Sequence, residues 1–216
     1  MTTNHIANLE QKMDLINNNG LVMYRHNKFG KLACMQNDYV FDVFDSFFND
    51  IKPLNVLEIG TALGGFTCFL RHLLDTYSPS GRLLSYDIAD RPWFNDLRKY
   101  NIDIRVENIF FENYTSVLSE VVDFIQSPGV SVVLCDGAYK AHEFNLFAEF
   151  IKPGDFILAH DYSKTLDFFE EQVKGKYWNW CEIQESDIED SVSRYNLINY
   201  DEDNFYKSVW ACKKKI

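Results

Sequence analysis

The chain has 216 residues, of which 46% are apolar and 25% are charged, and its formal net charge is -11. This length and apolar content are typical of a single globular domain and argue against a disordered chain. The negative charge argues against nucleic acid as a partner, because affinity for a phosphate backbone depends largely on Lys and Arg. No segment approaches the ~20 apolar residues of a membrane span, and the N-terminus lacks the apolar run of a signal peptide, so no membrane contact is expected.

The cysteines indicate a reducing compartment. Their number is odd and no two have CxxC spacing, so neither a disulfide framework nor a zinc site is predicted. We therefore expect a cytoplasmic protein. The five positions are Cys34, Cys68, Cys135, Cys181 and Cys212.

Three elements are predicted before the first buried strand. Residues 4–18 favour a short amphipathic helix, residues 24–35 an irregular segment, and residues 37–49 a second helix with one apolar face. We interpret residues 1–50 as a helical extension that forms a lid, and residues 51–216 as the main part of a single domain. The apolar face of the second helix consists of Val40, Val43, Phe44, Phe47 and Phe48.

From residue 56 onward, strands alternate with helices, and this order predicts a doubly wound, mostly parallel sheet. Two further strand-like stretches, 177–183 and 205–211, suit a final hairpin, and the basic run 213–215 suggests a solvated tail. The expected strands are 56–59, 81–87, 102–107, 130–134 and 156–159. The expected helices are 65–74, a short one after residue 92, 114–125, 141–151 and one ending near residue 174.

A glycine-rich turn follows the first strand of this sheet. Gly60 ends the strand, and Gly64 and Gly65 open the next helix. Glycine at such a turn lets the backbone approach a ligand that a Cβ would exclude, and open α/β sheets bind nucleotide-like ligands at this edge. Glu58 stands two residues before the turn, where its carboxylate either orients the loop or reaches a polar group of the ligand.

The second strand ends in an acid, Asp87, which lies 27 residues after Gly60. A carboxylate at that place can accept hydrogen bonds from both ribose hydroxyls, as in dinucleotide-binding folds. The turn reads GTALGG and so lacks the GxGxxG spacing of a pyrophosphate site. These features predict a nucleoside ligand without phosphates. After the third strand, Asn108 is placed to hydrogen-bond the edge of a ligand, and Ile109 or Phe110 to pack against it.

The acid and glycines of the turn, followed by Asp87, resemble the class I S-adenosylmethionine-dependent methyltransferases over residues 53–163. The resemblance implies a Rossmann-like fold of seven strands, the last of them antiparallel. It also implies that S-adenosylmethionine is the cofactor. The residues implied to bind it are Glu58, Gly60, Thr61, Gly64, Gly65, Asp87, Asn108, Ile109 and Asp136.

Polar side chains gather at the ends of the fourth and fifth strands. Asp136 follows the fourth, and His160 and Asp161 follow the fifth. Neighbouring parallel strands end side by side, so these groups are expected to converge at the ligand edge. The pattern is similar to that of the cephalosporin, macrolide-sugar and rhamnosyl O-methyltransferases, and more distantly to catechol O-methyltransferase. It implies that the three residues bind a divalent metal that holds the acceptor hydroxyl.

Several alternatives remain for this cluster. His160 stands where the relatives have Asp or Glu, and imidazole suits Mn better than Mg. His160 also suits a general base, because its ordinary pKa is near neutrality. Lys140 is a second candidate for the base, if its pKa is lowered. Asp136 and Asp161 are otherwise explained as turn or helix-capping residues.

These motifs together predict an S-adenosylmethionine-dependent methyltransferase. It would transfer methyl to the oxygen of a small hydroxylated acceptor such as a sugar, with Asp136, His160 and Lys140 as catalytic residues and Mg or Mn as a potential second cofactor. Residues 51–216 would be the catalytic domain, and a homo-oligomer is compatible with the sequence. Two alternatives are a cofactor-binding module without turnover and another nucleotide-using Rossmann-like enzyme, which the absence of GxGxxG disfavours.

Overall fold

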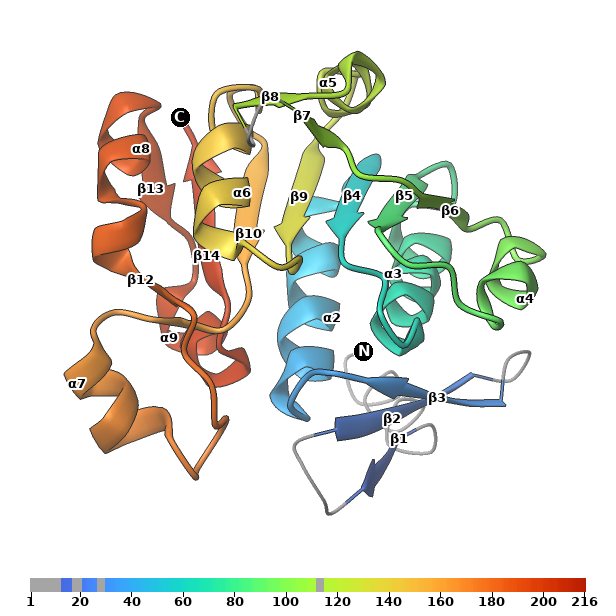
Figure 1. The fold of residues 1–216 in the computed structure, drawn as a ribbon, viewed down its shortest axis with the longest axis horizontal. Coiled ribbons are helices and arrows are strands. Elements are labelled where there is room, and N and C mark those ends of the chain that lie inside the picture. Colours follow the sequence, from blue (N-terminus) through green and yellow to red (C-terminus); the bar gives the residue numbers. More distant parts are fainter. Residues whose placement is uncertain (1–12, 17–20, 27–29, 112–114) are drawn as a thin grey trace.

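The computed structural model describes residues 13–16, 21–26, 30–111 and 115–216, with side chains from residue 32 onward. Within this part of the chain, a seven-stranded sheet has the order β13-β14-β10-β9-β4-β5-β6 (Figure 1). Its strands are β4 (Asn55–Ile59), β5 (Arg82–Asp87), β6 (Asp103–Val106), β9 (Ser131–Cys135), β10 (Phe156–Ala159), β13 (Leu197–Asn199) and β14 (Ala211–Lys215).

The strands β6, β5, β4, β9 and β10 run parallel to one another. Strand β14 runs antiparallel to both of its neighbours, β10 and β13. The predicted doubly wound, mostly parallel sheet of seven strands with an antiparallel last strand is therefore confirmed. The chain order reverses at β4, which pairs with β5 on one side and β9 on the other. Ligands of open α/β sheets bind at such a reversal, outside the carboxyl ends of the strands.

Helices cover both faces of this sheet (Figure 1), and the central strands β4, β9 and β10 are therefore buried on both sides. One face packs against α2 (Tyr39–Ile51) and α3 (Gly65–Tyr77), and the other against α5 (Ser119–Ile125) and α6 (Lys140–Phe147). Alternate side chains of one strand point to opposite faces. Val56 of β4 accordingly lies in the first core, and Leu57 in the second.

Helix α2 belongs to the main hydrophobic core. Phe41 and Phe69 of α3 meet edge to face with ring centroids 4.8 Å apart, and Phe44 and Phe66 meet in the same way at 5.2 Å. Such aromatic pairs add stability beyond the area they bury. The predicted helix over residues 37–49 is thus present and is part of the main body, which restricts a lid role to the residues before it.

The residues before α2 differ from the prediction. Strands β1 (Met13–Ile16), β2 (Leu21–His26) and β3 (Gly30–Cys34) form an antiparallel sheet, which Figure 1 shows beyond the carboxyl ends of β4 and β5. The predicted helix is wrong at residues 13–16, and its remaining residues lie outside the described part. The irregular segment predicted over 24–35 is largely two paired strands. Cross-strand pairing supplies order that the helical periodicity of the sequence does not indicate.

The segment after β10 also differs from the prediction. Residues 177–183 do not form a sheet strand; β12 (Ile183–Gln184) instead pairs with β11 (Tyr162–Ser163). Residues 205–211 begin in a helix and reach the sheet only at residue 211, where β14 starts. The strand that precedes β14 in the chain and pairs with it is therefore β13, not a strand over residues 177–183. Short apolar runs do not separate a buried helix turn from a strand, which explains both errors. The other elements here are α7 (Leu166–Phe168), a π-helical turn (Phe169–Val173), α8 (Glu189–Arg194) and α9 (Glu202–Phe205).

The basic run at the C-terminus is not a solvated tail, because it forms the second half of β14. Lys213 is buried, and its ammonium donates to both carboxylate oxygens of Glu185, at 2.7 and 2.8 Å, and to Asn199. The alternation of a strand places Lys213 toward these partners, while Lys214 lies on the opposite face over the Phe156 ring. Within this lysine run, Lys213 is therefore part of the packed structure, while Lys214 points to the opposite face of the strand.

The remaining elements agree with the prediction apart from their bounds. A short helix, α4 (Phe94–Arg98), follows residue 92, and α5 begins at residue 119 rather than 114, after the paired strands β7 (Phe110–Phe111) and β8 (Ser116–Val117). No disulfide links the cysteines that the structure describes. Among the residues described, no helix combines the length and apolar character needed to cross a bilayer.

We expect Lys213→Met to lower the free energy of unfolding by about 1–3 kcal/mol. The substitution removes a buried ammonium that donates to the partly exposed Glu185 carboxylate and to Asn199. Lys214→Met removes the same charge one residue later, on the other face, and is expected to change stability by less than about 0.5 kcal/mol. Urea unfolding of the two variants beside the wild type measures the difference. Equal effects would contradict the structural role of Lys213.

Candidate active site

The turn after β4 brings three strand ends together. Gly60 has φ +100° and donates its N–H to the Tyr86 carbonyl of β5 at 2.8 Å. A Cβ on Gly60 would lie 2.3 Å from the backbone carbonyl oxygen of Asp136, which follows β9. A side chain is therefore excluded by both conformation and space. The glycine predicted for a close approach makes that approach to the neighbouring strand.

Gly64 and Gly65 serve the packing of α3 and do not line the pocket beside the turn. Gly64 has φ +79°, and a Cβ there would lie 2.6 Å from the Leu97 side chain. A Cβ on Gly65 would lie 2.4 Å from the carbonyl oxygen of Ala33 in β3. The second glycine therefore lets the small N-terminal sheet contact the start of α3 directly.

Glu58 points into the protein interior rather than toward a ligand. Its carboxylate accepts hydrogen bonds from the hydroxyls of Thr67, at 2.7 Å, and Ser85, at 2.5 Å, and Thr61 bonds Ser85 in turn. Burial raises the pKa of Glu58 to about 8, with a smaller contribution from the nearby negative charge of Asp136. Glu58 and Thr61 thus connect β4, β5 and α3 beneath the turn, and neither lines the pocket.

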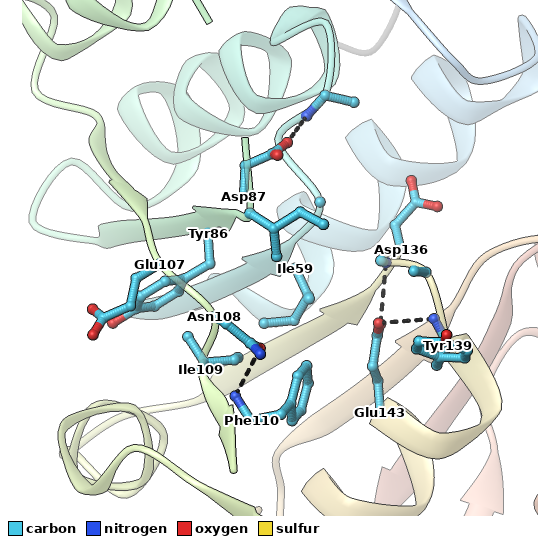
Figure 2. A pocket seen from close by; sticks show the side chains of 15 residues that line it. Ile59, Tyr86, Asp87, Glu107, Asn108, Ile109, Phe110, Asp136, Tyr139 and Glu143 are labelled. Atoms are coloured by element: carbon cyan, nitrogen blue, oxygen red, sulfur yellow. Dashed lines mark hydrogen bonds between the residues drawn. The ribbon is translucent and has the colours of Figure 1, made fainter. Parts of the chain in front are cut away.

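A pocket of about 230 Å³ opens at the carboxyl ends of β4, β5, β6 and β9 (Figure 2). Five residues predicted to bind the cofactor line it: Gly60, Asp87, Asn108, Ile109 and Asp136. The remaining lining residues are Ile59, Ala62, Tyr86, Ile88, Glu107, Phe110, Gly137, Ala138, Tyr139 and Glu143. The site predicted from the turn and the strand ends is therefore present as one cavity, with polar groups at two of its ends.

Asp87 is held by the backbone at the edge of this pocket. One carboxylate oxygen accepts from the N–H of Ala62 at 2.8 Å, and the other from the N–H of Ala89 at 2.9 Å. Each oxygen keeps a further lone pair with which to accept a ligand hydroxyl. Beyond the next strand, Asn108 accepts from the N–H of Phe110 at 3.1 Å, which fixes the loop that carries Ile109. These contacts orient polar and apolar groups toward the same cavity.

Glu143 of α6 was not identified from the sequence, although it shapes the loop after β9. Its buried carboxylate accepts from the N–H of Gly137, at 3.1 Å, and of Tyr139, at 3.3 Å (Figure 2). Burial raises its pKa to about 7, although the two backbone donors act in the opposite direction. A Cβ on Gly137 would lie 2.2 Å from Glu143. Tyr139 is not a capping residue type, and Glu143 follows it by four positions instead of the three of a capping box, so the sequence carries no standard signal for this contact.

Asp136, His160 and Asp161 converge as predicted, with one ligand-type atom from each lying within 4.8 Å of the others. His160 Nδ1 is 3.1 Å from Asp136 Oδ1 and 3.5 Å from Asp161 Oδ1. Asp161 has φ +57°, a backbone conformation that Asp tolerates better than most residues. Its Oδ1 also accepts from the indole N–H of Trp178 at 2.5 Å.

Lys140 lies inside this cluster. Its ammonium is 3.0 Å from Asp161 Oδ2, 3.8 Å from Asp136 Oδ1 and 2.7 Å from Glu182 Oε2, and it donates to the Gly137 carbonyl at 3.1 Å. Burial lowers the pKa of Lys140, but the attraction of Asp136 and Asp161 outweighs it, so the net shift is upward. Lys140 is therefore a persistent cation, and this argues against its predicted role as a general base.

His160 is enclosed by aromatic rings. The centroids of Trp210 and Trp178 lie 4.9 and 5.4 Å from that of the imidazole. Burial lowers the pKa of His160, yet Asp136 and Asp161 reverse this and raise it overall. Its Nε2 is buried without a hydrogen-bond partner among the described residues, and only Nδ1 faces the carboxylates. His160 itself does not line the pocket, whereas its partner Asp136 does.

Gln36 connects the segment before α2 to the site. Its side-chain amide donates to Asp136 Oδ2 at 2.8 Å and accepts from the indole N–H of Trp210 at 2.9 Å. The next residue, Asn37, donates to the carbonyls of Tyr177 and Lys207, at 3.1 and 2.7 Å. These contacts span 100 to 174 positions of the chain, so no local sequence pattern predicts them.

The fold and the pocket define a Rossmann-like nucleoside-binding protein with an acidic cluster beside its binding edge. The model of the rhamnosyl O-methyltransferase/CmcI family matches residues 23–212. The chain belongs to this family, which confirms the prediction of a class I S-adenosylmethionine-dependent methyltransferase. No sequence among curated proteins matches the chain.

Solved structures agree with this fold. A CmcI structure without ligand has a TM-score of 0.60 and one with Mg and SAM 0.57; both are 11% identical and cover 89% of this chain and 76% of their own. A putative methyltransferase from Thermobifida fusca has a TM-score of 0.52 at 11% identity, covering 82% of this chain and 79% of its own. At this identity the likeness establishes the fold alone.

The raised pKa of Glu58 predicts a pH-dependent stability. From about pH 5 to about pH 8 the folded chain keeps a proton on Glu58 that the unfolded chain has released, so stability should fall as pH rises, by up to about 1.4 kcal/mol per pH unit. Glu58→Gln removes this contribution and should make the dependence shallower, while the raised pKa values of Glu143 and His160 leave a remaining slope of the same sign. Urea unfolding of the ligand-free protein across this range measures it.

Glu149→Gln is the matched control for this experiment, because it replaces an exposed acid on the surface after α6. Its pH dependence should follow that of the wild type. The expected role of Glu58 fails if Glu58→Gln retains the full wild-type slope.

Proposed function

We propose that this enzyme transfers the methyl group of S-adenosylmethionine to a hydroxyl oxygen of a small hydroxylated molecule. The observation that carries the proposal is the continuity of the pocket from Asp87 at one end to Asp136 at the other. A nucleoside ligand and an acceptor bound at these two ends would meet over the carboxyl ends of β4 and β9. Family membership supplies the reaction class.

The cofactor would lie along the β5 and β6 side of the pocket. Asp87 would accept hydrogen bonds from the ribose hydroxyls through the lone pairs that its backbone donors leave free. Ile109 and the exposed Ile88 would flank the adenine, and Asn108 would reach its edge. The sulfonium would then point toward Asp136, the part of the pocket where Gly60 keeps the backbone bare.

Methyl transfer breaks the bond from sulfur to methyl and forms a bond from methyl to the acceptor oxygen, while the hydroxyl proton must leave. We propose that Asp136 takes this proton, because it lines the pocket and His160 holds its Oδ1 in place from behind. Lys140, 3.8 Å from the same oxygen, would stabilise the charge that develops on the acceptor. Positioning of the two reactants supplies the rest of the rate.

A divalent ion was expected at Asp136, His160 and Asp161, and the donor types suit Mn or Mg. Their positions fit an ion less well. Asp161 Oδ2 already pairs with Lys140, and its Oδ1 accepts from Trp178. The His160 nitrogen that faces the cluster, Nδ1, already hydrogen-bonds Asp136. The proposed methyl and proton transfers therefore involve no metal.

The residues before α2 are proposed to complete the acceptor side. Gln36 touches Asp136 directly, and the small sheet of β1, β2 and β3 lies beyond the strand ends (Figure 1). A lid formed by the first 50 residues is thus proposed only for those that precede α2. The described cysteines form no disulfide, which favours a reducing, cytoplasmic setting.

Calorimetric titration of S-adenosylmethionine and of S-adenosylhomocysteine tests the proposal. We expect both to bind the wild type and Asp87→Ala to lose at least about tenfold in affinity, because the ribose then lacks its acceptor. Asp90→Ala is the control: it removes an exposed acid from the same loop, outside the pocket, and should bind normally. Thermal unfolding checks that both variants fold.

Three outcomes would contradict the proposal. Full affinity in Asp87→Ala would remove Asp87 from the ribose site. Binding of a nicotinamide dinucleotide in preference to S-adenosylmethionine would favour another Rossmann-like enzyme. A protein that binds S-adenosylmethionine but transfers methyl to no hydroxylated acceptor would instead be a cofactor-binding module.

A further inference from the structure

The cationic group of Lys140 occupies the centre of the acidic cluster. Lys140 is the first residue of α6, and its side chain is only 7% exposed. The ammonium lies within 3.1 Å of oxygens from Asp161, Glu182 and Gly137, and 3.8 Å from Asp136. These oxygens come from three separate parts of the chain, residues 136–137, 161 and 182, so the site around the ammonium is built by the tertiary fold.

A divalent ion at this cluster would need the same oxygens. An ammonium 3.0 Å from Asp161 and 3.8 Å from Asp136 leaves no room for a second cation between those carboxylates without strong repulsion. The other oxygens of the two residues are taken as well, by Trp178 on Asp161 and by Gln36 on Asp136. The cluster is therefore neutralised and hydrogen-bonded by the protein itself.

Glu182 shows that the cation site is larger than the predicted triad. It lies next to β12 and forms the shortest contact of the ammonium, 2.7 Å, although half of its side chain is exposed. Buried charges are tolerated when they are paired and hydrogen-bonded. One buried lysine with three carboxylates around it satisfies this condition for Asp136 and Asp161, and Glu182 holds the lysine from the solvent side.

We propose that Lys140 is the resident cation of this active site and takes the place of a divalent metal. The inference deepens the proposed function and rests on it for the role of the cluster beside the acceptor. It implies that the wild type binds divalent ions weakly. It also implies that removal of the lysine charge uncovers a metal site formed by Asp136, Asp161 and Glu182.

The test is a titration of Mn²⁺ into the metal-free 216-residue protein, in which electron paramagnetic resonance measures the free Mn²⁺ at each step. We expect Lys140→Met, which keeps a long unbranched side chain but removes the charge, to bind one Mn²⁺ at least about tenfold more tightly than the wild type. Lys140→Met with Asp161→Asn should lose this gain. Lys174→Met removes an exposed lysine paired with Glu170 and should leave Mn²⁺ affinity at the wild-type level.

Each alternative outcome is decisive. Tight Mn²⁺ binding by the wild type, unchanged in Lys140→Met, would overturn the proposal. If Lys140→Met folds poorly, its thermal unfolding with and without Mn²⁺ replaces the titration: stabilisation beyond that of the wild type supports the proposal, and none overturns it. S-adenosylmethionine is titrated into the same samples. Its failure to bind any of them would reject the proposed function and leave the Mn²⁺ result standing.

Discussion

The close approach of Gly60 to the carbonyl of Asp136 is the constraint on which the site depends. It brings the end of β4 against the loop after β9, while the Gly60 N–H ties the same turn to β5. A residue with a Cβ would separate these strand ends and move Asp136 away from the pocket. The contact thus sets the distance between the proposed cofactor end, at Asp87, and the proposed acceptor end.

The second constraint is the cost of burying charge at those strand ends. Asp136 and Asp161 lie on neighbouring parallel strands and would repel each other if they were left unpaired. Lys140 and His160 offset this repulsion, and Trp178 supplies a further donor. Beneath the turn the protein uses another solution: burial favours a neutral Glu58 that accepts from two hydroxyls. Burial among hydroxyl partners thus distinguishes Glu58 from Asp136 and Asp161, which face a lysine and a histidine.

Most of the central fold and the location of the site were predictable from the sequence. A continuous apolar run that is followed by Gly60, Asp87 or Asp136 identifies a buried strand and its carboxyl end from local sequence alone. The ligand-binding edge of the sheet follows from these strand ends. The helices flanking them follow from periodicity and breakers. What failed was the pairing of short segments: the small N-terminal sheet, β13, and the burial of Lys213. These depend on partners far away in the chain, which a single sequence does not reveal.

The same limit separates two kinds of site residue. Asp136 and Asp161 are recognisable because each follows a strand, whereas Lys140 and Glu182 meet only in the folded chain, 42 positions apart. The sequence presents Lys140 as a candidate base near a helix start and gives no sign that acids surround it, yet its position there lets a four-carbon side chain reach carboxylates at the ends of two strands. A cation fixed to the start of α6 cannot exchange with solvent ions, so its charge stays in place whichever ions are present. That permanence is compatible with an acceptor site whose electrostatics are set by the fold.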